Sequence, residues 1–119
     1  FVDPPSNRAT SPVRLNSEKS FIPFRGERTL KRVLTPHNDG ALRMYIMHVG
    51  PSGSSGDALY THDGEEAGFV LKGGIALTVG DTQYQLRAGD SFRFSSQVPH
   101  AFRNTGKTPV EIVWVNLVQ

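Results

Sequence analysis

Residues 82–95 read TQYQLRAGDSFRFS, and apolar and polar side chains alternate in this stretch on both sides of a short glycine turn. Before the turn, every second residue from Thr82 to Leu86 shares one face, and after it Phe92 and Phe94 alternate with polar neighbours. A period of two residues is typical of a half-buried β-strand, because successive side chains of a strand point to opposite faces of the sheet. The stretch therefore predicts two strands joined by a turn.

The rest of the chain continues this pattern, with short apolar segments separated by turn residues. No window shows sustained apolar spacing at a helical period, and glycine or proline interrupts every helix-length stretch. Short strands with turn signals roughly every 8–12 residues are typical of an all-β sandwich or barrel. We expect the loop 50–56 to end one strand, and the further strands to lie at residues 30–34, 41–49, 69–72, 75–79 and 110–118.

The composition excludes several classes of protein. A chain of 119 residues corresponds to one domain, with a core large enough to be stable without disulfides. The absence of cysteine excludes a disulfide scaffold, a thiolate zinc site and a cysteine nucleophile. No apolar run approaches the roughly 20 residues of a membrane span, and the N-terminus does not resemble a signal peptide. We therefore expect a cytoplasmic protein that does not bind a membrane.

Charge is distributed unevenly along the chain. Residues 1–35 hold seven Lys and Arg against three Asp and Glu, a balance of +4, whereas residues 36–119 hold six against eight, a balance of −2. Residues 1–20 contain three prolines and little apolar periodicity, which predicts a linker or N-terminal extension before a folded domain at residues 21–119. The chain begins with Phe1 rather than Met, so we expect a domain that belongs to a longer protein.

Two histidines occur in contexts that suit metal binding. His62 precedes Glu66 by four positions, and a bend at Asp63-Gly64 would allow both side chains to reach one ion. His100 follows an expected strand. Two imidazoles and one carboxylate form a ligand set that suits Fe, Mn, Ni or Zn and leaves coordination positions open. A His-x-x-x-Glu pair also occurs by chance, so spacing alone leaves both interpretations open.

The order of these residues resembles the two motifs of the cupin superfamily. His62 and Glu66 match the first motif, Gly-x5-His-x-His-x3,4-Glu-x6-Gly, and His100 and Asn104 match the second, Gly-x5-Pro-x-Gly-x2-His-x3-Asn. The resemblance covers roughly residues 30–118 and implies a cupin-type antiparallel β-barrel, also called a double-stranded β-helix or jelly roll. It also implies that His62, Glu66 and His100 are the metal ligands.

The chain departs from the motifs at two places. Tyr60 occupies the position of the first His in the first motif, and Ser95-Ser96-Gln97 replaces Pro-x-Gly in the second. Three of the four ligands of the superfamily remain, which allows a divalent metal ion (Zn, Fe, Mn or Ni) but does not demand one. Tyr60 is expected to hydrogen-bond a ligand, to coordinate weakly or to close the barrel mouth.

Several residues are candidates for lining a cavity inside such a barrel. Arg43 would pair with a ligand carboxylate, with exposure to solvent as the simpler interpretation. His48 would line the cavity or serve as a hydrogen-bonded core histidine. Phe102, Trp114 and Met44 are expected in the barrel core, and core residues of this kind also line the cavities of such barrels. The candidate ligand-binding residues are Tyr60, Arg43, His48, Phe102 and Trp114.

Within the cupins, residues 62–73, 86–92 and 98–104 are most similar to the C-terminal sensor domain of helix-turn-helix regulators of the XRE type. This resemblance implies a non-enzymatic homodimer that binds a small-molecule effector in the barrel. It would contact DNA through a separate N-terminal domain outside this chain. The alternative is a stand-alone metal-dependent cupin enzyme, such as a dioxygenase or isomerase. A cupin that binds sugars or other small molecules without a DNA partner ranks last.

Overall fold

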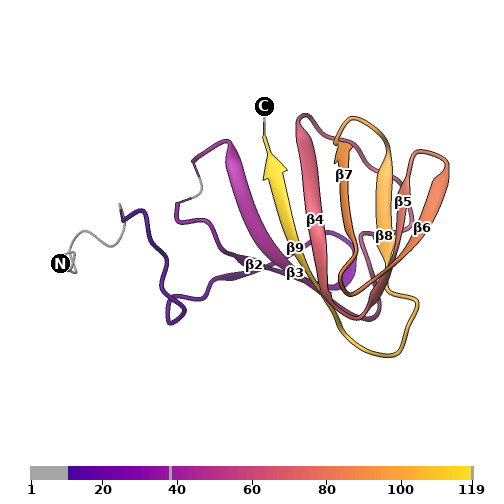
Figure 1. The fold of residues 1–119 in the computed structure, drawn as a ribbon, viewed down its shortest axis with the longest axis horizontal. Coiled ribbons are helices and arrows are strands. Elements are labelled where there is room, and N and C mark those ends of the chain that lie inside the picture. The colour runs from indigo at the N-terminus through magenta and orange to yellow at the C-terminus, as the bar shows by residue number, and fades with distance from the viewer. Residues whose placement is uncertain (1–10, 38, 119) are drawn as a thin grey trace.

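A computed structural model describes residues 11–37 and 39–118, and within them the regular structure is entirely β (Figure 1). None of these residues belongs to a helix that could cross a membrane. The all-β prediction is therefore confirmed. In chain order, the strands are β1 (Phe21–Pro23), β2 (Glu27–Val33), β3 (Leu42–Ser54), β4 (Glu65–Lys72), β5 (Gly74–Val79), β6 (Thr82–Arg87), β7 (Ser91–Ser95), β8 (His100–Arg103) and β9 (Val110–Leu117).

The strands form one antiparallel sheet that curls into a nearly closed barrel, in the order β6-β5-β8-β3-β9-β4-β7. β2 also pairs with β3, and β1 pairs with β2. β3 pairs with β8 at a single position, where Ser54 lies opposite Arg103. In Figure 1, β9, β4 and β7 lie next to β3, and β8, β5 and β6 lie beyond β7. The expected antiparallel barrel is confirmed.

β3 is longer than the strand expected at residues 41–49, because it continues to Ser54. The prediction of a loop over residues 50–56 is therefore wrong for most of its length. The strand bends there, and a Cβ atom added to Gly53 would lie 2.8 Å from the carbonyl oxygen of Arg28 on β2. Only glycine fits so close to a neighbouring backbone, and the bend allows one strand to join both halves of the barrel.

Other strands also differ from the expectation, and β2 begins at Glu27, three positions before the expected start at Leu30. β4 begins at Glu65, four positions before the expected start at Phe69. β1 and β8 were not expected, since three and four residues are too few for an alternating pattern to be visible. They form because neighbouring strands pair with them: β2 pairs with all of β1, and β5 pairs with all of β8. Their strand structure depends on these partners, of which β2 follows β1 directly and β5 lies about 20 residues before β8.

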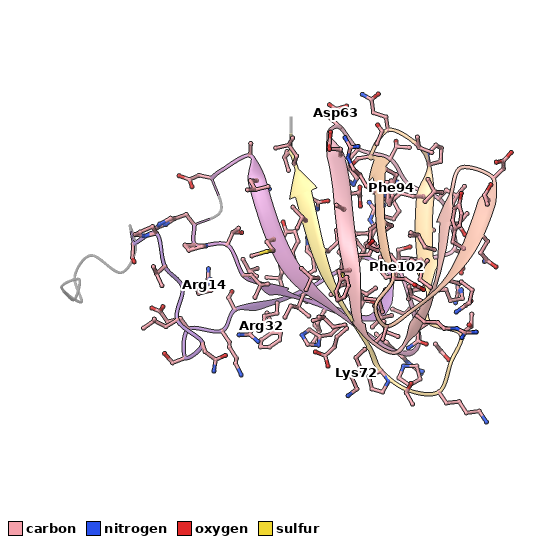
Figure 2. The ribbon with its side chains drawn as sticks, viewed as in Figure 1. Arg14, Arg32, Asp63, Lys72, Phe94 and Phe102 are labelled. Atoms are coloured by element: carbon pink, nitrogen blue, oxygen red, sulfur yellow. The ribbon has the colours of Figure 1, made fainter. Side chains whose placement is uncertain are left out.

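The core occupies the barrel interior and takes alternate residues of each strand. On β3, Tyr45 and Met47 face inward, so Met44 lies on the outer face and is exposed, contrary to the expectation. Phe102 and Trp114 are buried as expected, and Figure 2 shows Phe102 between the strands. Truncation of such a side chain typically costs about 2–5 kcal/mol. The buried apolar cluster comprises Met47, Val49, Val70, Ile75, Leu77, Phe102, Val110, Ile112 and Trp114.

Residues 11–20 precede β1 and form neither strand nor helix. They lie beside the loop between β2 and β3, to which the His37 ring connects them by a 2.8 Å hydrogen bond with the carbonyl of Ser11. The other half of the expected linker, residues 1–10, lies outside the described residues. The boundary at residue 20 stays a prediction.

Candidate metal and ligand site

Three chain segments meet at one end of the barrel and bring the expected metal ligands together. Glu66 is the second residue of β4, His100 is the first of β8, and His62 lies in the segment before β4. Tyr60 and His100 form an antiparallel bridge, in which each N–H donates to the other's carbonyl at 3.0 Å. The N–H of His62 donates to the carbonyl of Ser96, also at 3.0 Å. These backbone bonds place the two histidines side by side.

His62, Glu66 and His100 form a compact group, the His₂Glu cluster. His62 Nε2 lies 2.9 Å from Glu66 Oε2, and His100 Nε2 lies 3.4 Å from the same oxygen. The three candidate ligand atoms lie within 4.8 Å of one another. Glu66 and His100 are buried, whereas the His62 side chain is 38% exposed. The cluster is therefore accessible to solvent from the His62 side.

Both imidazole rings are oriented by the backbone. His100 Nδ1 lies 2.7 Å from the carbonyl oxygen of Val98, and His62 Nδ1 lies 3.2 Å from that of Asp63. A carbonyl oxygen can only accept, so Nδ1 carries the proton in each ring. In the neutral rings, Nε2 then directs a lone pair toward the Glu66 carboxylate. His100 Nε2 is buried without a hydrogen-bond partner among the described residues. Acceptors that face each other in this way require a cation, either a proton or a metal ion, between them.

The Glu66 carboxylate is held by two buried donors. Trp114 Nε1 donates to Oε1 at 2.8 Å, and Ser96 Oγ donates to Oε2 at 2.6 Å. These bonds fix the carboxylate's orientation. Ser96 was not predicted as a site residue. The only signal was its place in the Ser95-Ser96-Gln97 departure from the motif.

The His₂Glu cluster fits a first-row divalent metal ion. Two imidazole nitrogens and one carboxylate oxygen match the ligand preference of Fe, Mn, Ni and Zn. The Nδ1–H bonds to backbone carbonyls and the hydrogen bonds on Glu66 are the supporting interactions that such ligands usually have. Tyr60 takes the position of a fourth ligand, and its ring centroid lies 4.3 Å from that of His100. Burial and, secondarily, the Glu66 charge raise the pKa of Tyr60, so its phenol stays neutral.

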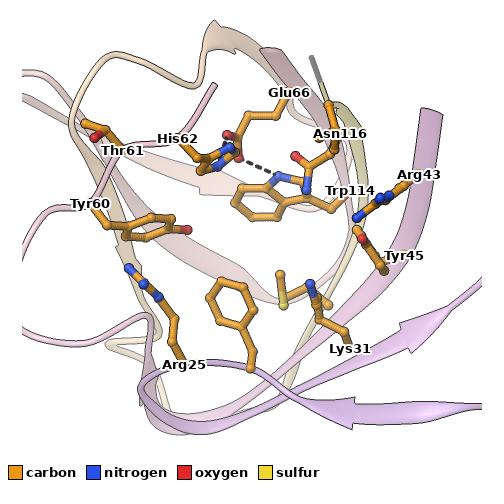
Figure 3. Close-up of a pocket in the computed structure, with 13 residues that line it drawn as sticks. Arg25, Lys31, Arg43, Tyr45, Tyr60, Thr61, His62, Glu66, Trp114 and Asn116 are labelled. Carbon is orange, nitrogen blue, oxygen red and sulfur yellow. Dashed lines mark hydrogen bonds and ion pairs between the residues drawn. The ribbon is translucent and has the colours of Figure 1, made fainter. Parts of the chain in front are cut away.

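A pocket of about 280 Å³ opens beside the cluster (Figure 3). Of the five predicted ligand-binding residues, Tyr60, Arg43 and Trp114 line it. It also includes polar and aromatic residues that the sequence did not single out, because they do not belong to the motifs. Among them are Arg25, which lies between β1 and β2, and Lys31, Tyr45 and Asn116, which lie on β2, β3 and β9. Asn116 Oδ1 is buried and has no partner among the described residues, so the pocket contains a polar group that a ligand can satisfy.

The structure does not bring Phe102 and His48 to this pocket. Phe102 packs behind Trp114, with ring centroids 5.4 Å apart, and acts as core. His48 is next to Met47, which faces inward, so its own side chain is on the outer face of β3. There it contacts the ring of Phe21 at 5.8 Å and lines a separate surface groove. Alternation along β3 therefore separates His48 from Arg43 and Tyr45.

Comparison with known families gives a match over much of the chain. A family model described as a cupin domain matches residues 45–116, more than half of the sequence. This range contains all three residues of the His₂Glu cluster and most of the pocket wall, but neither Arg25 nor Lys31.

Curated relatives include the HTH-type transcriptional regulator PuuR of Escherichia coli (strain K12), which is 35% identical over 77 residues. The match covers 65% of this chain and 41% of PuuR. PuuR of Shigella flexneri matches to the same extent. The chain therefore spans about two fifths of the length of these regulators.

Solved structures of similar fold include a domain of a regulator and a predicted enzyme. The Cupin_2 domain of an XRE family transcriptional regulator from Enterobacter cloacae has a TM-score of 0.68 and 18% identity, covering 78% of this chain and 99% of that one. A predicted oxalate decarboxylase from Thermotoga maritima has a TM-score of 0.69 and 23% identity, covering 90% and 99%. At these identities the similarity is one of fold alone.

Proposed function

The chain belongs to the cupin family, and on that premise we propose that it is the effector-binding domain of a DNA-binding transcriptional regulator. A small molecule enters the pocket beside the His₂Glu cluster, which holds a divalent metal ion (Zn, Fe, Mn or Ni). DNA is bound by a separate helix-turn-helix domain, and the regulator acts as a cytoplasmic homodimer on paired half-sites. The similarity to PuuR, at 35% identity, supports the regulatory assignment.

The observation that carries the binding role is the His100 lone pair, which has no hydrogen-bond partner among the described residues and belongs to a cluster beside an open pocket. The lone pair of His100 Nε2 has no hydrogen-bond donor among the described residues, and both rings are oriented so that Nε2 faces Glu66. A metal ion bound there would supply an electrophilic anchor for ligand oxygens. The protein's own groups orient the ligand: Tyr60 presents a neutral phenol, and Trp114 presents the edge and face of an indole.

The local structure suits transmission of a binding event. Tyr60 and His62 lie on a short segment that is held to β8 and its preceding turn by the backbone bonds to His100 and Ser96. A ligand that contacts Tyr60 or His62 therefore acts on two parts of the chain at once. An effector shifts a regulator only by binding one of its conformations more tightly than the other.

The first test is to determine the coding sequence upstream of the codon for Phe1. A block with helix-turn-helix spacing supports the proposal, and the full-length protein should then release or bind its operator DNA when an effector is added. A start codon directly upstream of Phe1 would contradict the regulatory role and leave a stand-alone cupin.

A metal-dependent enzyme is the second candidate, and Lys31 favours it. Burial and then the charge of Arg43 lower the pKa of Lys31, which lines the same pocket as the cluster. A lysine with a lowered pKa is suited to proton transfer. Turnover by the metal-loaded chain that disappears in both His100→Ala and Lys31→Met would establish this function instead.

A further inference from the structure

Three cations line the pocket beside the His₂Glu cluster. Arg25, Lys31 and Arg43 all line it, and we call them the cationic wall. In Figure 3, Arg25 lies below Tyr60, and Lys31 and Arg43 lie on the far side of Trp114 from His62. Glu66 is the one carboxylate among the described lining residues, and it already faces both histidines.

No residue of the cationic wall forms an ion pair with a carboxylate among the described residues. The arginine ion pairs seen there are formed by Arg93 and Arg103. Aromatic rings support two members of the cationic wall instead. Lys31 Nζ lies 4.2 Å from the ring centroid of Tyr45 and 5.2 Å from that of Phe24, and Arg25 Cζ lies 4.5 Å from that of Tyr60. Cation–π contacts position a charge without neutralising it.

Arg43 is anchored in a way that leaves its donors available. Its Nε donates to the carbonyl of Gly40 at 3.1 Å, which holds the guanidinium at the pocket edge. No hydrogen bond of its two terminal nitrogens is seen within the described part of the chain. The two terminal nitrogens of an arginine can donate to both oxygens of one carboxylate, so Arg43 has donors available to bind an anion.

The lowered pKa of Lys31 agrees with an uncompensated positive charge. Desolvation is the larger cause, and the charge of Arg43 is the second. An anion placed between these two side chains would relieve the mutual repulsion. The free pocket therefore holds positive charge that a ligand of opposite sign can use.

The register of the sheet sets the distance between Arg43 and the His₂Glu cluster. Arg43 on β3 pairs with Asn116 on β9, which in turn pairs with Glu66 on β4. Neighbouring strands lie about 4.8 Å apart, so the backbone positions of Arg43 and Glu66 are separated by roughly 10 Å. The pocket volume of about 280 Å³ is at the lower end of small-molecule sites. At about 30 Å³ per water, it suits a ligand on the order of ten non-hydrogen atoms.

We propose that the ligand of this pocket is a small organic acid. Its carboxylate pairs with Lys31 and Arg43, and its body lies along Trp114 and points toward the His₂Glu cluster. This inference rests on the proposed effector-binding role and assigns the ligand's charge. An amine of the same size would meet three cations and one carboxylate that is already engaged. The pocket therefore selects against cationic ligands.

Trp114 provides a reporter, because it is the single tryptophan of the chain and lines the pocket. The 119-residue chain is titrated at constant ionic strength with mono- and dicarboxylates, diamines and diols of two to six carbons, and with inorganic phosphate. We expect at least one carboxylate to change the fluorescence saturably, with a dissociation constant at least tenfold below those of the diamine and diol of equal length.

A matched pair of variants tests the assignment. Lys31→Met with Arg43→Gln should weaken binding of that carboxylate at least tenfold and leave metal content unchanged. The control, Lys72→Met with Arg87→Gln, removes the same charge from exposed residues outside the pocket and should leave binding within twofold. Figure 2 shows Lys72 at the end of the barrel opposite Asp63. Near-ultraviolet circular dichroism would verify folding.

Each other outcome has a distinct meaning. Tighter binding of a diamine, a diol or phosphate than of every carboxylate overturns the organic acid but leaves the effector-binding role intact. If no probe changes the fluorescence, both the organic-acid ligand and the effector-binding role are contradicted. Equal weakening in the two double variants would mean that net charge, and not the cationic wall, attracts the ligand.

Discussion

The two sides of the pocket satisfy their polar groups in opposite ways. In the His₂Glu cluster, hydrogen bonds from Trp114 Nε1, from Ser96 Oγ and to backbone carbonyls leave lone pairs directed at one point. In the cationic wall, aromatic rings hold positive charges that lack a carboxylate within the described structure. The His₂Glu cluster therefore lacks a cation, and the cationic wall lacks an anion. The groups that a folded chain leaves unpaired thus indicate the charge of what it binds.

Glu66→Ala removes the carboxylate of the His₂Glu cluster and should have the largest effect of the variants considered. It removes the acceptor of two buried donors, Trp114 Nε1–H and Ser96 Oγ–H. Unpaired buried donors cost about 1–3 kcal/mol each, so the free energy of unfolding in urea should fall by about 3 kcal/mol. Metal analysis of the purified variant should find no stoichiometric divalent ion.

Glu66→Gln is the matched control. Its amide oxygen can accept from Trp114 while its N–H group donates toward the histidine lone pairs. Stability should therefore stay within about 1 kcal/mol of the parent chain. Metal affinity should still fall by about 100-fold, since a neutral amide replaces the charged ligand. Unchanged metal content in this variant would exclude the His₂Glu cluster as the metal site.

His62→Ala and His100→Ala separate the binding role from the structural one. Both should abolish metal binding. His100 is fully buried and its loss leaves a cavity, so we expect about 3 kcal/mol of destabilisation in metal-free buffer. His62 is partly exposed, and its loss should cost less than about 1 kcal/mol. Calorimetry in the presence of a chelator measures the destabilisation of both variants. Equal values would contradict the prediction that the buried His100 contributes more to stability than His62.

Ser96→Ala tests the support of the carboxylate. Loss of its 2.6 Å hydrogen bond to Glu66 should weaken metal affinity by about 10–100-fold, because supporting bonds orient and tune a ligand. The exposed neighbour offers a control, and Ser95→Ala should leave the affinity unchanged. A competition assay with a chromophoric chelator measures both. Similar affinities for the two variants would show that the bond does not contribute.

The smallest effect is a pH dependence on the cationic side. Because the pKa of Lys31 is lowered, the folded protein releases this proton at lower pH than the unfolded chain does. The unfolded state then binds more protons as pH approaches the ordinary value of 10.5, so stability rises with pH in that window. Lys31→Met should lack this rise. Parallel profiles of unfolding free energy against pH for both proteins would refute the assignment.

The motif residues could be predicted because their chemistry is local in the sequence. His62 and Glu66 are four positions apart, and the resemblance supplied His100. Of the cationic wall, Arg43 was among the predicted ligand-binding residues, but Arg25 and Lys31 were not. Arg25 and Lys31 belong to a part of the chain without motif residues, and they face the pocket only because β2 pairs with β3.

Alternation in sequence predicts a strand but does not say which face of it is buried. Met44 and His48 share one side of β3, and Arg43, Tyr45 and Met47 share the other. The alternating pattern supports either choice, and the sequence analysis expected residues of both sets, Arg43, Met44 and His48, in the core or the cavity. The choice depends on pairing with β9, which places Tyr45 opposite Trp114 and so inside the barrel. This partner lies far along the chain, beyond the reach of a local pattern.

The sequence by itself determined the all-β class, the positions of most strands and the three residues of the His₂Glu cluster. The strand pattern and the His62–Glu66 pair depend on short-range spacing. His100 was found from the order of the motif residues along the chain. Tertiary structure alone decided the continuation of β3, the donors that hold Glu66 and the separation of His48 from the pocket. It also decided the cationic wall. These features depend on strand register, and register is set by the packing of residues that are distant in the sequence.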